Sequence, residues 1–146
     1  MKIEQLTIYQ LEKIVPLFDA YRQFYEQESD MDAARAFLKA RLEKKQSVIF
    51  VAQQDDDYIG FTQLYPTFSS VGLKPAYILN DLYVAQQARS QGVAKQLMAV
   101  AFQYAQQQNA RYISLETAKD NSVAQALYKK MMTEDTEVKH YTRSFI

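Results

Sequence analysis

Cysteine is absent from this chain, and histidine occurs only once. Without a thiol, the sequence excludes disulfides, a cysteine nucleophile and a zinc site with cysteine ligands. The single histidine, His140, lies six residues from the end of the 146-residue chain. This position disfavours a Ser-His-Asp triad and a histidine-ligated metal centre. We therefore expect a site without metal.

The chain also lacks an excess of charge and a long apolar run. Its 17 basic and 17 acidic side chains cancel, so no global field attracts nucleic acid or an anionic membrane surface. No segment approaches the roughly 20 apolar residues of a membrane span. The first residues, Met1 to Gln5, lack the apolar stretch of a signal peptide. The expectation is a cytoplasmic protein with neither nucleic acid nor membrane as a partner.

Apolar residues, in contrast, are plentiful: they make up 48% of the chain, and aromatic residues make up 13%. This composition excludes a disordered chain, and the length fits one domain with a sizeable core. The three glycines and three prolines are scattered and form no linker. We predict a single domain over residues 1–146.

Hydrophobic periodicity predicts an alternation of strands and helices. Strands are expected at 2–8, 47–52, 58–66, 77–84, 111–116 and 138–143, and helices at 10–26, 30–42, 92–108 and 121–132. This order predicts an α/β fold with a central mixed, mostly antiparallel twisted sheet of about six to seven strands and about four flanking helices. The strands on either side of helix 92–108 should be parallel and joined by a right-handed crossover.

A polar turn between strand 77–84 and helix 92–108 carries the pattern Arg-x-x-Gly-x-Ala, from Arg89 to Ala94. Such a turn directs several unpaired backbone N–H groups at one point, at the positive end of a helix dipole, where phosphate binds. Gly92 allows a ligand to approach the backbone closely, because a Cβ would crowd it. The alternative is that Gly92 only starts the helix and Ala94 packs against the sheet.

A second pattern, Asn-x-x-Ala-x-x-Leu-Tyr, runs from Asn121 to Tyr128. These two residues are seven apart, close to two helical turns, so they share one face of a helix. Both side chains could then face the same groove. The alternatives are a helix N-cap for Asn121 and a half-buried core residue for Tyr128.

Together the two patterns resemble the GNAT superfamily of N-acetyltransferases, over residues 77–132. Strand 78–84 also resembles family members that act on small amines, including the diamine acetyltransferases. The resemblance implies a GNAT-like fold, acetyl-CoA as co-substrate, transfer of an acetyl group to a primary amine, and a homodimer. The chain departs from the family at Met131-Met132-Thr133, where many members have Gly-Phe. That departure leaves the acceptor side and the dimer contact open.

The resemblance also implies roles for individual residues. The CoA pyrophosphate would be held by the backbone amides of Arg89, Ser90, Gln91, Gly92, Val93 and Ala94. Leu82, Tyr83 and Val84 are expected along the pantetheine arm, with the Leu82 N–H at the thioester carbonyl and the Val84 backbone paired as in a strand. Asn121 would hydrogen-bond near the pantetheine or the sulfur, and Tyr128 would protonate the departing thiolate.

The reaction needs a base, because an aliphatic amine with a pKa of about 10 is almost wholly charged at neutral pH. Asp81 is the first candidate, acting directly or through a water, and Glu116 is the second. Strict alternation along the strand puts Asp81 opposite Leu82, and a single bulge would reverse this. A purely structural carboxylate is the alternative for Asp81.

The acceptor wall is expected from the turn between the first two helices. There Glu28 and Asp30 lie near Tyr25, and carboxylates beside aromatic rings suit a small cationic amine. Asn80 and Glu116 are added from the strands expected to flank the thioester. The alternative is a solvated loop with capping residues.

The leading hypothesis is an acetyl-CoA-dependent N-acetyltransferase that acts on a small-molecule amine by direct attack in a ternary complex. One alternative is acetylation of a protein lysine or N-terminus. Another is a CoA-binding regulatory module without turnover, which should tolerate Tyr128→Phe and Asp81→Asn. A generic α/β fold without a nucleotide site is the third.

Overall fold

Five strands form one sheet in the computed structural model, which describes residues 1–146. The chain divides into two units, residues 1–115 and residues 116–146. The first unit contains β1 (Lys2–Gln5), the short 3-10 helix η1 (Ile8–Gln10), α1 (Leu11–Phe24), α2 (Met31–Glu43), β2 (Val48–Gln54), β3 (Asp57–Ser69), β4 (Lys74–Val84), the 3-10 helix η2 (Gln86–Ala88), α3 (Val93–Gln107) and β5 (Ile113–Ser114). The second contains α4 (Ser122–Met131).

The strands are ordered β1-β2-β3-β4-β5, and all neighbours are antiparallel except β4 and β5. That parallel pair is joined by α3, as the order of elements predicted. The mixed α/β class and the four helices are therefore confirmed. The sheet has five strands, fewer than the six to seven predicted.

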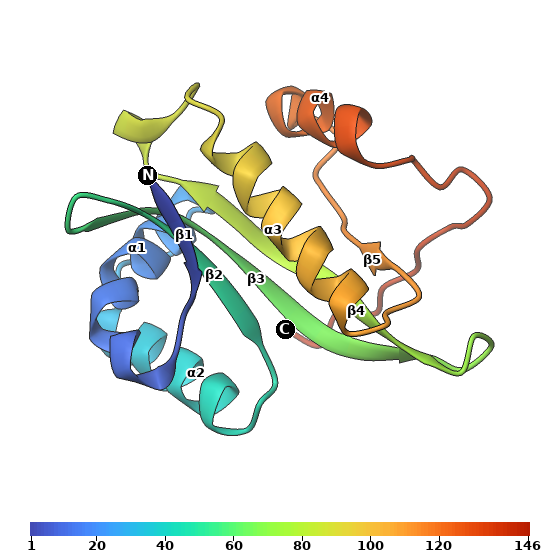
Figure 1. Cartoon of the computed structure of the whole chain (residues 1–146), viewed down its shortest axis with the longest axis horizontal. Coiled ribbons are helices and arrows are strands. Elements are labelled where there is room, and N and C mark those ends of the chain that lie inside the picture. Colours follow the sequence, from blue (N-terminus) through green and yellow to red (C-terminus); the bar gives the residue numbers. More distant parts are fainter. The chain divides into compact units, whose positions relative to one another are not determined.

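Two layers of helix cover the sheet of the first unit, with α1 and α2 on one face and α3 on the other (Figure 1). The apolar stripes of these helices supply the core. On α1 the stripe includes Ile14, Val15 and Phe18, and on α3 it includes Leu97, Met98 and Ala101, all buried. Burying one such side chain contributes about 1.5–3 kcal/mol.

Gly60 explains how closely α3 approaches the sheet. A Cβ at Gly60 would lie 3.2 Å from Val93 and 3.3 Å from Leu97 of α3, and 3.0 Å from the Tyr83 carbonyl oxygen. Any larger residue at this point of β3 would push the N-terminal turn of α3 outward. The first two turns of α3 therefore pack directly against the backbone of β3 at Gly60.

Two predicted strands differ from the structure. The strand predicted at 138–143 was wrong, because the chain forms neither helix nor strand after α4 and the side chains from Thr133 onward are exposed. Its alternation has no apolar face to bury, since Lys139, Tyr141 and Arg143 interleave with the equally polar His140 and Thr142. The strand predicted at 111–116 shortens to β5, which pairs only with Tyr77 and Ile78. None of the helices combines the length and apolarity needed to cross a membrane.

Candidate active site

A β-bulge in β4 places Asn80 and Asp81 on the same face of the sheet. Asp81 lies opposite Gln63 and Leu79 lies opposite Leu64, so Asn80 is the extra residue of β4. Both Asn80 and Asp81 line a pocket on the face covered by α1 and α2. The bulge therefore decides the face of the sheet on which Asp81 lies, which the alternation along the strand left open.

Asp81 is a buried carboxylate, with only 5% of the residue exposed. Its oxygens accept hydrogen bonds from Gln63 Nε2 at 2.6 Å and Asn80 Nδ2 at 3.1 Å. The Tyr21 hydroxyl is a third donor. An ionised carboxylate accepts about four hydrogen bonds. The three donors hold the side chain in place and leave room for one more.

The two tyrosines near Asp81 remain protonated at neutral pH. Burial, reinforced by the negative charge of Asp81, raises the pKa of Tyr21 far above its usual value. The same two causes raise the pKa of Tyr65 to about 12. Tyr21 is thus a permanent donor to Asp81, whereas the Tyr65 hydroxyl accepts a hydrogen bond from Gln63 Nε2 at 3.3 Å.

The pocket has a volume of about 340 Å³. It is lined by side chains of α1, α2 and the two central strands: Phe18, Arg22, Ala33, Ala34, Phe37, Tyr65, Asn80 and Asp81. A second hollow of about 340 Å³ lies at the β3–β4 turn, lined by Phe68, Ser69, Leu73, Lys74 and Pro75. Because it has no carboxylate, only the first pocket has a group able to take a proton from an amine.

Next to this pocket, one edge of β4 is open. β5 pairs with β4 only at Tyr77 and Ile78, so from Leu79 to Val84 the strand pairs with β3 alone. Leu82, the predicted donor to the thioester carbonyl, lies in this segment. A strand edge with unpaired N–H and C=O groups suits pairing with an extended amide-containing ligand.

Arg89 fixes the end of β4. Its Nε donates to the Val84 carbonyl oxygen at 3.0 Å. The guanidinium also lies 5.4 Å from the ring centroid of Phe24 and 5.7 Å from that of Tyr83, which is cation–π distance. The Val84 carbonyl therefore already has a donor within the chain, and the Arg89 side chain packs on aromatic rings as well as adding positive charge.

The turn after β4 presents unpaired amides at five of the six predicted positions, and the sixth, the Arg89 N–H, donates to the Gln86 carbonyl at 3.3 Å. α3 begins at Val93, and no hydrogen bond involves the backbone N–H groups of residues 90–95. Ser90 (φ 63°) and Gly92 (φ 78°) adopt left-handed conformations, and a Cβ at Gly92 would meet no atom within 4 Å. Free amides at a helix N-terminus beside open space fit the oxygens of a pyrophosphate. This turn is therefore suited to the diphosphate of CoA.

In the second unit, Asn121 is the N-cap of α4 and accepts a hydrogen bond from the Ala124 N–H at 3.3 Å. Asn121 thus caps the helix, which was the alternative to a role in binding CoA, and its role toward CoA stays a prediction. Tyr128 on the same helix is half-buried, and its role as a proton donor also stays a prediction. Helix α4 ends at Met131 without a glycine: Met132 is extended and donates its N–H to the Tyr128 carbonyl at 2.7 Å. Glu116, the second candidate base, is exposed and lies 3.2 Å from His140 Nδ1.

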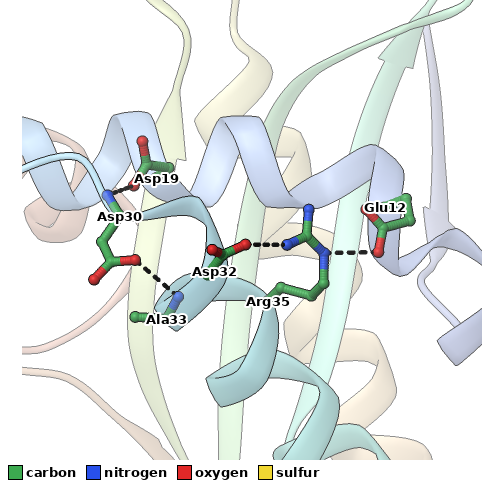
Figure 2. A network of polar contacts seen from close by, with 6 residues as sticks. All are labelled: Glu12, Asp19, Asp30, Asp32, Ala33 and Arg35. Carbon is green, nitrogen blue, oxygen red and sulfur yellow. Dashed lines mark hydrogen bonds and ion pairs between the residues drawn. The ribbon is translucent and has the colours of Figure 1, made fainter.

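The acidic turn between α1 and α2 is a capping structure (Figure 2). Asp30 accepts from the Ala33 N–H at 3.0 Å, and its own N–H donates to Asp19 Oδ1 at 2.8 Å. Ser29 Oγ donates to Asp19 Oδ2 at 2.6 Å. Tyr25 and Glu28 are exposed, and neither lines the pocket. Of the predicted acceptor-binding residues, the structure places only Asn80 in the pocket.

Arg35 ties the same two helices together on the surface. Its Nε lies 2.8 Å from Glu12 Oε1 on α1, and its Nη1 lies 3.0 Å from Asp32 Oδ1 on α2 (Figure 2). Together with the hydrogen bonds of Asp19, these contacts link the two helices that form one wall of the pocket. Because the Glu12 and Asp32 side chains are exposed, the ion pairs themselves contribute little to stability.

Replacing Asp19 with asparagine should destabilise the fold in a pH-dependent way. The Ser29 hydroxyl, followed by the Asp30 amide, holds the pKa of the Asp19 carboxyl below its usual value. A depressed carboxyl pKa contributes stability above the unfolded-state value, and that stability is lost as pH falls through the folded-state pKa. Asp19→Asn should therefore lower the free energy of unfolding by about 1–3 kcal/mol at pH 7 and by less at pH 3.

Urea unfolding at both pH values, with exposed Asp56→Asn as the matched control, checks this prediction. The control should lie within about 0.5 kcal/mol of the wild type at either pH. An equal loss for Asp19→Asn at pH 7 and pH 3 would contradict the role given to the charge.

Sequence reasoning missed Gln63 and Arg22. Gln63 is completely buried and orients Asp81. It lies on one face of β3 between Phe61 and Tyr65, so a polar residue inside an apolar alternation was the available signal. For Arg22, local sequence gave no signal, since only the packing of α1 over β4 brings it to the pocket.

A turn suited to a pyrophosphate, an open strand edge and a pocket with a buried carboxylate are features expected of an enzyme that transfers an acyl group from a CoA thioester to an amine. A family model described as "Acetyltransferase (GNAT) family" matches residues 11–132. The chain therefore belongs to the GNAT family and is an N-acetyltransferase. Acetyl-CoA is the acetyl donor of this family.

Relatives agree with this assignment. An uncharacterized N-acetyltransferase of Bacillus subtilis (strain 168), YhfO, is 48% identical over 142 residues, which cover 97% of this chain and 95% of the relative. A crystal structure of a probable acetyltransferase is 44% identical with a TM-score of 0.95, covering 100% of this chain and 99% of the other. At 24% identity, the aminoglycoside N-acetyltransferase AAC(6')-Iy, solved with CoA, shares the fold with a TM-score of 0.81 over 99% of this chain and 95% of its own.

Proposed function

We propose that this N-acetyltransferase acetylates the primary amine of a small molecule, by direct attack in a ternary complex with acetyl-CoA. The observation that carries the proposal is the buried Asp81 carboxylate in a pocket beside the open edge of β4. An amine in this pocket would lie close both to a base and to the strand expected to hold the thioester.

The main chain would position the co-substrate. Acetyl-CoA supplies the acetyl group as a thioester. The free amides of residues 90–95, with Arg89 fixing the preceding turn, would hold its pyrophosphate. The Leu82 N–H would donate to the thioester carbonyl, where negative charge develops, an interaction that stabilises the transition state.

Two side chains would move protons. Asp81 would take the proton of the ammonium acceptor, directly or through a water, and the donors Tyr21, Gln63 and Asn80 would keep its carboxylate in place. Tyr128 would give a proton to the departing thiolate, and Asn121 would bind near it. Starting from the ammonium, the nitrogen would lose two protons: Asp81 takes the first before attack, and the second leaves as the tetrahedral intermediate collapses. The sulfur would gain one proton, so each acetyl transfer releases one proton overall.

The pocket favours a small acceptor. Its volume of about 340 Å³ lies at the lower end of the roughly 300–1,000 Å³ usual for small-molecule sites. Its apolar walls, Phe18, Phe37, Ala33 and Ala34, leave few groups to bind a peptide backbone. The aminoglycoside acetyltransferase named above, a similar fold, acts on a small molecule. The proposal includes one catalytic domain over residues 1–146. It also includes a homodimer, which light scattering would test through the molar mass in solution.

Thiol release from acetyl-CoA, measured across diamines, amino acids, aminoglycosides and peptides, tests the proposed function. At least one small amine should be acetylated, and peptides should not. Tyr128→Phe should lower kcat by about 10²-fold, within the range for a general acid. Tight acetyl-CoA binding without turnover for any amine would instead indicate a regulatory module, and selective turnover of peptides would indicate a protein acetyltransferase.

A further inference from the structure

One wall of the acceptor pocket carries a positive charge, that of Arg22, in addition to the Asp81 carboxylate. Arg22 of α1 is the only basic residue in the lining, and Asp81 is the only acidic one. Arg22 is half-buried, so its guanidinium is partly removed from water. A pocket with one charge of each sign is complementary to a ligand that also carries both signs.

Arg22 forms no salt bridge within the protein, and its one hydrogen bond is a long one of 3.4 Å from Nη1 to the Glu28 carbonyl. Its charge acts on Asp19 at longer range, as one of the causes that lower the pKa of that carboxyl. The nearby Asp19 carboxylate already accepts from Ser29, the Asp30 N–H and Gln23. A guanidinium has five N–H donors, so most of those of Arg22 remain for a ligand.

A second arginine adds positive charge to the same wall. The Arg41 guanidinium lies 4.9 Å from the ring centroid of Phe37, which lines the pocket. Its Nε donates to the uncharged Gln46 Oε1 at 2.7 Å, and it forms no ion pair. By contrast, Arg35 on the outer surface contacts two carboxylates. Arg22 and Arg41 therefore form no salt bridge with a carboxylate of the protein.

Four of the eight lining residues are apolar. The rings of Phe18 and Phe37 stack with centroids 6.2 Å apart, and Ala33 and Ala34 complete that wall. A ligand that spans the pocket would thus carry a hydrophobic body as well as its charged ends. An additional ammonium group would instead be repelled by Arg22.

Resting on the proposed function, we infer that the acceptor is an amine that also carries a carboxylate and an apolar body, as a hydrophobic amino acid does. Its ammonium group binds Asp81, which takes the proton, and its carboxylate binds Arg22. A planar guanidinium pairs with a carboxylate through two parallel hydrogen bonds. This acceptor class differs from the diamines suggested by the sequence.

Matched acceptors test the inference. L-Leucine and L-phenylalanine are each compared with the amino alcohol in which a hydroxymethyl group replaces the carboxylate, alongside cadaverine and O-phosphoethanolamine. The amino acids should be acetylated with a kcat/KM about 10- to 100-fold above that of their amino alcohols. Arg22→Gln should bring that ratio close to one, Arg22→Lys should keep part of it, and the exposed control Lys39→Gln should leave it unchanged.

Binding without acetyl-CoA, followed by NMR titration, gives a second readout. The wild type should bind L-leucine, and Arg22→Gln should lose that binding. Faster acetylation of cadaverine or of the amino alcohols than of the amino acids overturns the inference but leaves the proposed function intact. Preference for O-phosphoethanolamine overturns the assignment of a carboxylate. Absence of turnover with every amine overturns the proposed function, and the titration then decides the ligand class alone.

Discussion

Asp81→Asn is expected to lower kcat for acetyl transfer by about 10²- to 10⁴-fold, the usual contribution of a general base. The substitution removes the only carboxylate in the pocket and changes little in side-chain volume. The affinity for acetyl-CoA should be unaffected, because the free amides expected to hold its pyrophosphate lie outside the pocket, at residues 90–95. Steady-state kinetics and calorimetric titration with acetyl-CoA measure the two quantities separately.

A loss of stability has to be separated from a loss of chemistry. In the variant, the new side-chain amide would face donors from Gln63 and Tyr21 that point at a carboxylate in the wild type. Such a mismatch costs about 1–3 kcal/mol, so Tm should fall by several degrees. Assays are therefore made well below the Tm of the variant, with exposed Asp56→Asn as a control that should match the wild type in both rate and Tm.

The alternative for Asp81, a purely structural carboxylate, predicts a different pattern. Tm would fall by the same amount, while kcat below the transition would stay within a few-fold of the wild type. The pH profile separates the two cases further. Loss of a base should make the residual rate rise with pH across the range in which the free amine forms, whereas a structural role should leave the shape of the profile unchanged.

Local patterns were enough to predict most of the elements. The apolar stripe from Val93 to Tyr104 predicted α3, and Asp30 before an apolar run predicted the start of α2, which it caps through the Ala33 N–H. The turn at 89–94 was predicted from Gly92 and the neighbouring strand and helix. In each case, the cause of the structure lies within a few residues of the pattern, so a local argument suffices.

What sequence could not predict depends on contacts between distant segments. Whether Asp81 faces the pocket depends on the bulge at Asn80, which is visible only in the pairing of β4 with β3. The juxtaposition of Arg22 and Asp81 depends on how α1 packs over β4. The alternation at 138–143 predicted a strand that the structure does not contain. A strand needs a partner edge and an apolar face as well as a period of two.

Gly92→Asp is expected to weaken acetyl-CoA binding by about 10- to 100-fold while leaving the fold intact. The space next to Gly92 is open, since a Cβ added there would meet no atom within 4 Å, so the new carboxylate would occupy the volume expected for the pyrophosphate. Two like charges about 4 Å apart repel by several kcal/mol near a protein surface, and each 1.4 kcal/mol is about tenfold in Kd. Calorimetric titration with acetyl-CoA measures the change.

Gly92→Asn is the matched control, because it adds a side chain of the same shape without the charge. At φ 78° both residues are tolerated better than others, since Asn and Asp enter the left-handed region most readily after glycine. A negative charge at the N-terminus of α3 even favours the helix dipole, so the aspartate should be at least as stable as the asparagine. Weak binding in the more stable variant can then come only from repulsion of a bound anion. Equal affinities for the two variants would place the pyrophosphate elsewhere on the protein.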